Sequence, residues 1–264
     1  MTSNIESYPF SESPGKEIGR GYTSIVKELG PDWVIKEFNP LKPDGTPKDK
    51  EAFEKSQNPS HIQDLQETQR ILSQDSIYGS KILPTYWVLR DDQNGKEKYI
   101  TIQKRFKGET LEALRDQKRF TKFFNENRDL REQMLELMWG SKKALVEMGI
   151  CDDLHVGNIA LVEKDGKTRE LMLFDIPNLI EFQKILYGQP PASTKVRKYI
   201  LAIMETRASR LEKYEKWIDV TEEEKLALDQ KFGIENGKYS NVVNNLLQMK
   251  KQQFLTLPIN INSL

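Results

Sequence analysis

Hydrophobic and polar positions follow one pattern in the first third of this chain and another in the remainder. Short runs between residues 18 and 103 are rich in β-branched and aromatic residues, and Gly, Pro, Asp or Asn separates them, which predicts strands joined by turns. The runs cover residues 18–29, 33–38, 86–89 and 99–103. Beyond residue 110, apolar residues recur three or four positions apart, which predicts helices. We therefore expect an α+β protein in which a small antiparallel sheet precedes a larger helical part.

Several of the expected helices carry recognisable end signals. Apolar positions at helical spacing cover residues 110–125, 130–148 and 196–218. Thr221 begins a capping box, and Gly233 stands where the helix that follows it would end. Ser60 is expected to cap a helix that reaches about residue 74, and Ser240 to cap a last helix near the C-terminus.

The composition of the chain limits which kinds of partner and which cellular compartment we expect. The 264 residues carry 40 basic and 40 acidic side chains, so charge gives no reason to expect nucleic acid or an anionic membrane as a partner. No apolar run approaches the ~18 residues of a membrane span, and the N-terminus lacks the features of a secretory signal. Cys151 is the only cysteine, which permits a reducing compartment. We expect a cytoplasmic protein, with signal-independent export into a host left open.

A helix, a polar loop and a hairpin follow one another between residues 130 and 174. Gly149 would end the helix, and Asp153 and Asn158 lie five positions apart in the loop. Asp175 comes directly after the second strand of the hairpin. A carboxylate can orient a hydroxyl and accept its proton, while carboxylate and amide oxygens suit Mg²⁺. Taken alone, the loop is also compatible with an ordinary polar connection.

The first predicted hairpin contains small residues followed by a lysine in an apolar strand. Gly19, Gly21 and Ser24 would let the backbone of the first turn approach a polyphosphate closely. Lys36 ends the run Val-Ile-Lys in the next strand. The glycines lead into a strand rather than a helix, so they do not form a dinucleotide-binding fingerprint.

These features occur in the order glycine loop, strand lysine, catalytic loop, hairpin and second Asp, which resembles the protein-kinase-like superfamily. The loop Asp-Leu-His-Val-Gly-Asn is most similar to the aminoglycoside-phosphotransferase-like and bacterial eukaryotic-like branches. The resemblance implies a bilobal fold, with a small antiparallel-sheet N-lobe and a larger helical C-lobe. Its expected divisions are a loose lead-in over 1–15, an N-lobe over 16–105 and a C-lobe over 106–264.

The resemblance also implies roles for individual residues. Lys36 would pair with the phosphates of ATP, and Glu67 would hold Lys36 in place, with Glu51 and Glu54 as rivals for Glu67. Asp153 would orient the acceptor hydroxyl.

The remaining implied contacts are with the nucleotide and its metal. Asn158 and Asp175 would hold Mg²⁺, with Mn²⁺ as a possible substitute. The residues expected to contact ATP are Gly19, Gly21, Ser24, Val26, Lys36, Gln103 and Arg105. Gln103 and Arg105 belong to the segment that would act as the hinge, where backbone groups pair with adenine.

The chain departs from the protein-kinase pattern at three points. Cys151 and Asp152 stand where protein kinases have His and Arg, and that Arg captures a phosphorylated activation loop. Asp175 is followed by Ile-Pro-Asn rather than by the D-F-G continuation, and no A-P-E follows. We therefore expect activity that does not depend on phosphorylation of the activation segment.

The leading hypothesis is an Mg-ATP-dependent phosphotransferase that acts on a hydroxyl of a protein or a small molecule. A Ser/Thr-type protein kinase of the bacterial eukaryotic-like kind is slightly favoured over a small-molecule kinase. A pseudokinase that binds without turnover and an enzyme that transfers AMP are the alternatives.

Overall fold

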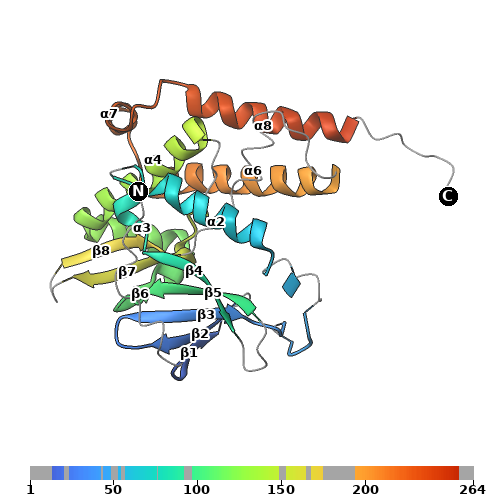
Figure 1. Cartoon of the computed structure of the whole chain (residues 1–264). Coiled ribbons are helices and arrows are strands. Elements are labelled where there is room, and N and C mark those ends of the chain that lie inside the picture. The colour runs from blue at the N-terminus through green and yellow to red at the C-terminus, as the bar shows by residue number, and fades with distance from the viewer. Residues whose placement is uncertain are drawn as a thin grey trace. The chain divides into compact units, whose positions relative to one another are not determined.

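The chain folds as two compact units in the computed structural model, shown in Figure 1. The first unit comprises Met1–Glu67 and Leu83–Lys107, and the second comprises Thr68–Ile82 and Gly108–Leu264. The structure describes residues 14–20, 24–42, 44–48, 53–54, 57–75, 77–91, 97–148, 153–164, 168–174 and 194–255.

The first unit is built on a five-stranded antiparallel sheet with the order β1-β2-β3-β5-β4. Its strands are β1 (Glu17–Arg20), β2 (Ser24–Leu29), β3 (Trp33–Phe38), β4 (Thr85–Asp91) and β5 (Glu97–Lys104). Each strand coincides with one of the β-branched and aromatic runs, so the strand predictions for this part of the chain are confirmed.

One face of this sheet carries a small apolar core. Leu29, Ile35, Ile100 and Ile102 are buried there. Side chains alternate between faces along a strand, so Lys36, the neighbour of Ile35, lies on the opposite face. The core face also carries Glu37, whose carboxylate is 2.6 Å from Lys27 Nζ and 3.5 Å from Lys98 Nζ. Burial alone would raise the pKa of Glu37, but hydrogen bonding and charge from the two lysines lower it overall.

The helix α2 (Pro59–Leu72) lies beside the edge strand β4, where Gln66 Nε2 donates to the backbone oxygen of Trp87 at 3.3 Å. It begins two residues earlier than expected, because a cap at Ser60 would have made His61 the first helical residue. Pro59 is the first helical residue, a position that proline favours because its missing N–H would have no partner there. Ser60 therefore lies inside the helix, and the prediction that it is the cap was wrong.

The second unit combines helices with a three-stranded antiparallel sheet of order β6-β7-β8. The strands are β6 (Gly108–Thr110), β7 (Ile159–Lys164) and β8 (Thr168–Leu173). The helices are α3 (Gln117–Glu126), α4 (Arg128–Met148), α6 (Thr194–Trp217), α7 (Glu222–Phe232) and α8 (Lys238–Leu255), with short 3-10 turns η1 (Gly79–Lys81), η2 (Leu111–Leu114) and η3 (Val156–Asn158). Together with the first unit this confirms the α+β class, an antiparallel-sheet N-terminal part followed by a helical C-terminal part.

Three helix ends show how local chemistry set the boundaries. Thr221 and Glu224 form both hydrogen bonds of the capping box, and Gly233 ends α7 with φ 70°, as expected. The expected helix over 110–125 is instead divided, because Asp116 accepts hydrogen bonds from two backbone N–H groups and starts α3 after η2. The last helix begins at Lys238, so Ser240 lies inside it and is not its cap.

The core of the second unit surrounds α4. Met134, Leu137, Met138 and Trp139 are buried along it, which accounts for the apolar stripe in the sequence. An aromatic group from α3 packs against α6, where the rings of Phe120 and Tyr214 stack with centroids 4.8 Å apart.

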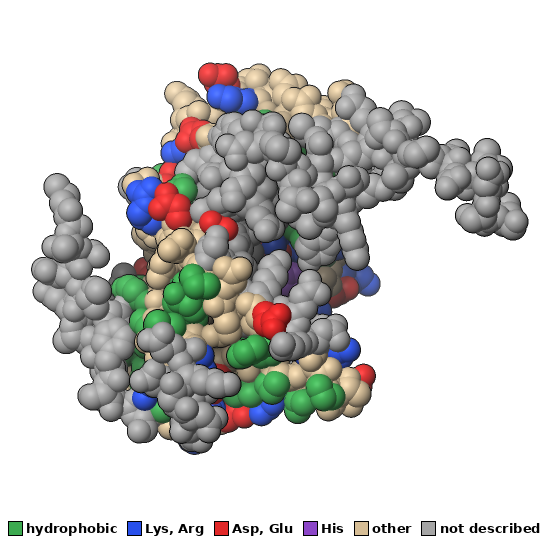
Figure 2. Space-filling view, turned by 45° about the vertical axis from the view of Figure 1, so that its right-hand side comes forward, with side chains coloured by type: hydrophobic (Ala, Val, Ile, Leu, Met, Phe, Trp, Pro, Cys, Tyr) green, Lys and Arg blue, Asp and Glu red, His purple; other side chains and the backbone are tan. Residues whose placement is uncertain are grey.

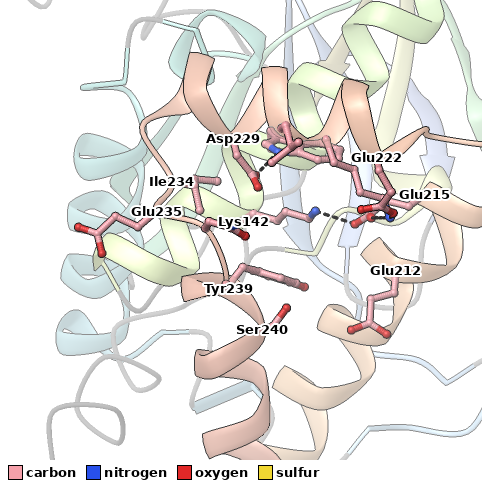
Figure 3. Close-up of a pocket in the computed structure, with 14 residues that line it drawn as sticks. Lys142, Glu212, Glu215, Glu222, Asp229, Ile234, Glu235, Tyr239 and Ser240 are labelled. Atoms are coloured by element: carbon pink, nitrogen blue, oxygen red, sulfur yellow. Dashed lines mark hydrogen bonds and ion pairs between the residues drawn. The ribbon is translucent and has the colours of Figure 1, made fainter.

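Lys142 is the more buried of the two lysines of α4. Together with Trp139, it connects α4 to α6 and α7. Its Nζ lies 2.7 Å from Glu215 Oε1 of α6 and 3.7 Å from the ring centroid of Trp139. The indole Nε1 of Trp139 in turn donates to Asp229 of α7 at 2.7 Å. Figure 3 shows these contacts at the wall of a cavity of about 250 Å³ between α4, α6, α7 and α8. The buried charge is thus paired, as its desolvation requires.

The segment Thr68–Ile82 belongs to the second unit because it is fastened to α4. Asp75 accepts the backbone N–H of Tyr78 at 2.8 Å, and its second oxygen pairs with Lys143 Nζ at 2.8 Å. The hydrogen bond with Asp75 is the main reason why the pKa of Lys143 is raised. Tyr78 itself is buried against Gly140.

On the face shown in Figure 2, acidic and basic side chains lie side by side at several places among the coloured residues. This agrees with the balanced total of 40 basic and 40 acidic residues. Among the helices that the structure describes, none combines the length and apolar character needed to cross a membrane.

Gly140 offers a test of this packing. A Cβ at this position would lie 2.3 Å from Cδ2 and 2.7 Å from Cγ of the buried Tyr78 ring. Helix propensity favours Ala over Gly by roughly 1 kcal/mol, but we expect Gly140→Ala to destabilise the protein by about 1–3 kcal/mol, because the ring must move. Urea unfolding measures the change. The penalty should shrink in a Tyr78→Ala background, and an undiminished penalty there would exclude the ring as its cause.

Candidate functional site

Within the first unit, three of the predicted nucleotide-contacting residues, Gly19, Val26 and Lys36, lie in one row of the sheet. Gly19 pairs with Val26, Val26 with Lys36, and Lys36 with Thr101, so these residues form one row across four strands. Directly opposed residues of antiparallel strands project to the same face. Val26, Lys36 and Thr101 therefore project together, away from the face that holds Ile35.

The described neighbours of Gly19 would also accept a larger residue at this position. A Cβ added there would meet only Val26 Cβ, at an ordinary 3.8 Å. With no side chain, Gly19 leaves space at the β1 end of the row that contains Lys36. Gly21 lies outside the described residues, so its expected contact with phosphates stays a prediction, as do those of Gly19, Ser24, Val26 and Lys36.

Gln103 and Arg105 make contacts within the first unit. The amide of Gln103 is buried and donates to Thr85 Oγ1 at 2.7 Å. The backbone N–H of Arg105 donates to the backbone oxygen of Asp32 at 2.8 Å. The guanidinium of Arg105 lies 3.2 Å from Glu28 Oε1. These contacts fix the end of β5, and the two units divide at Lys107. Recognition of the nucleotide by Gln103 and Arg105 stays a prediction.

Among the candidates for holding Lys36, Glu67 lies half-buried on α2 and is the last residue of the first unit before Thr68. Glu54 is exposed in a short helical turn, and Glu51 lies outside the described residues. The assignment of Glu67 stays a prediction.

In the second unit, the loop that follows α4 is pinned by its own sequence. Leu154 and Val156 are buried, so the residues between and beside them are turned to the partly exposed side. The backbone N–H of His155 donates to Asp153 O at 2.7 Å, and that of Asn158 donates to His155 O at 2.7 Å. Alternating apolar anchors and a tight turn thus hold Asp153 and Asn158 in one compact loop.

The side chain of Asn158 is held by a hydrogen bond to the backbone of its own loop. Its Nδ2 donates to the backbone oxygen of Asp153 at 3.2 Å. The amide oxygen of Asn158 takes no part in this hydrogen bond. Its backbone oxygen accepts the N–H of Phe174 at 3.1 Å, and Phe174 directly precedes Asp175. Asp175 itself lies outside the described residues. Asn158 therefore fits the hard-oxygen chemistry of Mg²⁺, while the role of Asp175 stays a prediction. Among the described residues, no group of three His, Cys, Asp or Glu side chains is arranged to hold a metal.

Asp153 is paired with two arginines of α6. Nη1 of Arg210 forms an ion pair with Oδ1, and Nη2 of Arg207 lies 3.7 Å from Oδ2. The distance to Arg207 exceeds hydrogen-bond length, so Oδ2 keeps acceptor capacity for a hydroxyl. The two ion pairs restrict the rotamer of Asp153 and orient its carboxylate.

One turn further along α6, Tyr214 supports the same loop. Its hydroxyl takes part in a hydrogen bond with the backbone of Val156, and burial raises its pKa above the ordinary value. Arg207, Arg210 and Tyr214 lie three or four positions apart, so one face of α6 contacts the loop over two turns.

His155 braces the loop. Its Nδ1 accepts the backbone N–H of Gly157 at 3.0 Å. Burial lowers the pKa of His155, and the positive charges of Arg210 and Arg115 lower it further, against the opposite effects of Asp153 and Glu112. A Cβ on Gly157 would lie 2.4 Å from Glu112 Oε2, so a larger residue there would displace the flexible end of the Glu112 side chain.

The sequence reasoning missed Arg207, Arg210 and Tyr214. A signal was present, because Arg207 occupies the inward stripe of α6 between Met204 and Leu211, which are both buried. A charge at a core-facing helix position calls for a partner. Nothing in the sequence identified that partner as Asp153, which lies more than fifty residues earlier.

No protein-family model and no curated protein matches the sequence. The solved structures to which the fold is similar include protein kinase domains.

Three of these structures share 12% sequence identity with this chain. The maize SIRK1 (sucrose-induced receptor kinase 1) kinase domain bound to AMP-PNP has a TM-score of 0.42, covering 94% of this chain and 98% of that one. The Rio2 kinase-ADP/Mg²⁺-phosphoaspartate complex from Chaetomium thermophilum has a TM-score of 0.33, covering 91% and 72%. Aerobactin synthetase IucC from a hypervirulent pathotype of Klebsiella pneumoniae has a TM-score of 0.40, covering 88% of this chain but only 46% of the synthetase. TM-scores this low carry no residue-by-residue correspondence, so the roles discussed here depend on this chain's own geometry.

The lowered pKa of His155 makes stability depend on pH. Below the ordinary value of 6.5, the unfolded chain binds a proton that folded His155 resists, so the free energy of unfolding falls as pH decreases. We expect the wild type to lose more stability than His155→Gln between about pH 7.5 and about pH 5.5. Urea unfolding at each pH gives the comparison, and His61, present in both proteins, cancels. Equal losses in the two proteins would contradict the assignment.

Proposed function

We propose that this protein is an Mg-ATP-dependent phosphotransferase that moves the γ-phosphate of ATP to an acceptor hydroxyl. Lys36 and the small residues of β1 and β2 bind the phosphates, and Glu67 holds Lys36. Asp153 orients the acceptor hydroxyl and accepts its proton. When bound, Mg²⁺ neutralises charge on the phosphates, with Asn158 and Asp175 as its protein ligands.

The observation that carries this proposal is the hydrogen-bonded geometry of the loop between α4 and β7. Asn158 bonds through its amide nitrogen to Asp153 and through its backbone oxygen to Phe174. A candidate base and a candidate metal ligand therefore lie in one rigid turn, one hydrogen bond from the residue that precedes the second carboxylate. An ordinary polar connection does not require this arrangement of oxygen groups.

The acceptor is either a protein or a small molecule. The sequence of the loop, Asp-Leu-His-Val-Gly-Asn, and the lack of an A-P-E segment favour a small molecule. The length of the chain, by contrast, is similar to that of eukaryotic-like kinases with reduced C-lobes, which act on proteins. We keep a slight preference for a Ser/Thr-type protein acceptor, with a small-molecule kinase as the second candidate.

Two other classes remain as alternatives. A pseudokinase would bind nucleotide without turnover, and an AMP transferase would bind ATP in the reversed sense. Incubation with Mg-ATP and acceptors, followed by mass spectrometry, separates the three classes. Transfer of phosphate gives a phosphate-sized gain, transfer of AMP gives a larger gain, and a pseudokinase gives a nucleotide-dependent thermal shift with no product.

Lys36 can be tested against a matched lysine on the neighbouring strand. Lys27 lies on the opposite face of the same sheet, where it pairs with Glu37 at 2.6 Å. We expect Lys36→Met to reduce phosphate transfer by about 100-fold or more, because a cation at the phosphates is lost. Lys27→Met removes only a partly exposed ion pair and should keep near wild-type turnover. Equal effects of the two substitutions on kcat/KM would count against a phosphate role for Lys36.

Asp175→Ala tests the metal assignment. Removal of the carboxylate should abolish Mg-dependent transfer and leave the circular dichroism spectrum and the urea midpoint close to wild type. Full turnover by this variant would show that Asp175 is not a metal ligand.

A further inference from the structure

Helix α6 brings two guanidinium groups to a single carboxylate. Arg207 and Arg210 project from successive turns toward Asp153, and each is the partner of a different carboxylate oxygen. The side chains of Arg207 and Arg210 are 12% and 21% exposed, whereas that of Asp153 is 31% exposed. The carboxylate is therefore the most open member of this cluster, and each of its oxygens has one of the two arginines as a partner.

A loop brace alone does not need this second cation. One guanidinium can satisfy a carboxylate through two parallel hydrogen bonds, and a second one nearby repels the first. Arg210 has five N–H donors and directs one of them at Asp153, so most of its donor capacity is not used by that carboxylate. Guanidinium forks of this kind match phosphate and carboxylate oxygens.

Arginines and carboxylates both act on the loop that holds Asp153. Burial is the first cause of the lowered pKa of His155, and the positive charges of Arg210 and Arg115 are the next. The carboxylates of Asp153 and Glu112 act in the opposite direction. Arg115 pairs with Glu112, whereas Arg207 and Arg210 share the single carboxylate of Asp153.

We propose that Arg207 and Arg210 bind an anionic group of the acceptor, a phosphate or a carboxylate, next to the hydroxyl that Asp153 orients. The position of this subsite beside the reacting hydroxyl rests on the proposed function. The anion shares guanidinium donors with Asp153, so the same two side chains fix the base and select the acceptor. Neutral alcohols lack the group that these arginines recognise.

Inorganic phosphate is the probe for the subsite, titrated into the full-length protein at constant ionic strength with chloride as the reference anion. Calorimetry should show that the wild type binds phosphate and that Arg210→Gln has lost this binding. Arg210→Lys, which keeps the charge but not the fork, should bind at least several-fold more weakly. Lys216→Gln removes a cation from the same helix and should bind like the wild type.

Asp153→Asn distinguishes an anion subsite from a structural brace. It removes the negative charge that competes for the arginines, so phosphate affinity should rise by about tenfold or more. Phosphate should also raise the melting temperature of this variant more than that of the wild type. If Asp153→Asn is folded by circular dichroism and binds phosphate no better than the wild type, the arginines serve only as a brace and the proposal fails.

The acceptor role is tested with matched pairs of compounds. One arm compares sugar alcohols with their monophosphates, and the other compares serine peptides with and without a neighbouring phosphoserine. Preference for the anionic member of either pair, lost in Arg210→Gln, supports the proposal and identifies the source of the anion. Equal use of neutral and anionic acceptors overturns it.

Failure of the proposed function gives a different result. If phosphate binds as expected but Mg-ATP gives no product with any acceptor, the anion subsite stands and phosphotransfer does not. If product forms and phosphate does not bind at Arg210, phosphotransfer stands and the anion subsite does not.

Discussion

The pairing of Lys142 with Glu215 is the constraint on which the geometry of the second unit depends. Lys142 is nearly fully buried on α4, and an uncompensated charge there would be strongly unfavourable, so Glu215 must lie opposite it. A slide of α6 by one turn would move every residue by ~5.4 Å and break this pair. The same register places Arg207 and Arg210 at Asp153. A contact deep in the helical core thus determines where the loop carboxylate finds its partners.

Much of the fold could be predicted because local sequence and tertiary structure agree. Alternating β-branched runs gave β2 and β3, and the capping box of Thr221 gave α7, since these signals act within a few residues. The errors arose where one residue competes with a general pattern. Pro59 started α2 ahead of Ser60, and Asp116 divided a stripe that looked continuous. Strand β6 is only three residues long and is defined by its pairing with β7, which no local pattern contains.

Some residues of the candidate site could be predicted from the sequence, and others could not. The five-residue spacing of Asp153 and Asn158 is local, so the sequence was enough to nominate both. The row through Val26 and Lys36 depends on the register of β2 against β3, which the sequence did not predict. The arginines were not predictable as partners of Asp153. Arg207 breaks an apolar stripe, which indicates a buried ion pair, but the choice among many acidic residues depends on how α6 packs.

If Asp153 is the base, as proposed, its two ion pairs suit one kind of chemistry better than another. A carboxylate nucleophile must donate its lone pairs to form a covalent bond, and two guanidinium groups would compete for them. In phosphoryl transfer the base forms no covalent bond with the substrate. The transition state is loose, and catalysis comes mainly from positioning and charge neutralisation. Arg207 and Arg210 fix the direction of the Asp153 carboxylate. A fixed direction is what the proposed reaction needs from this group, because its task there is to hold a hydroxyl in line with a phosphate.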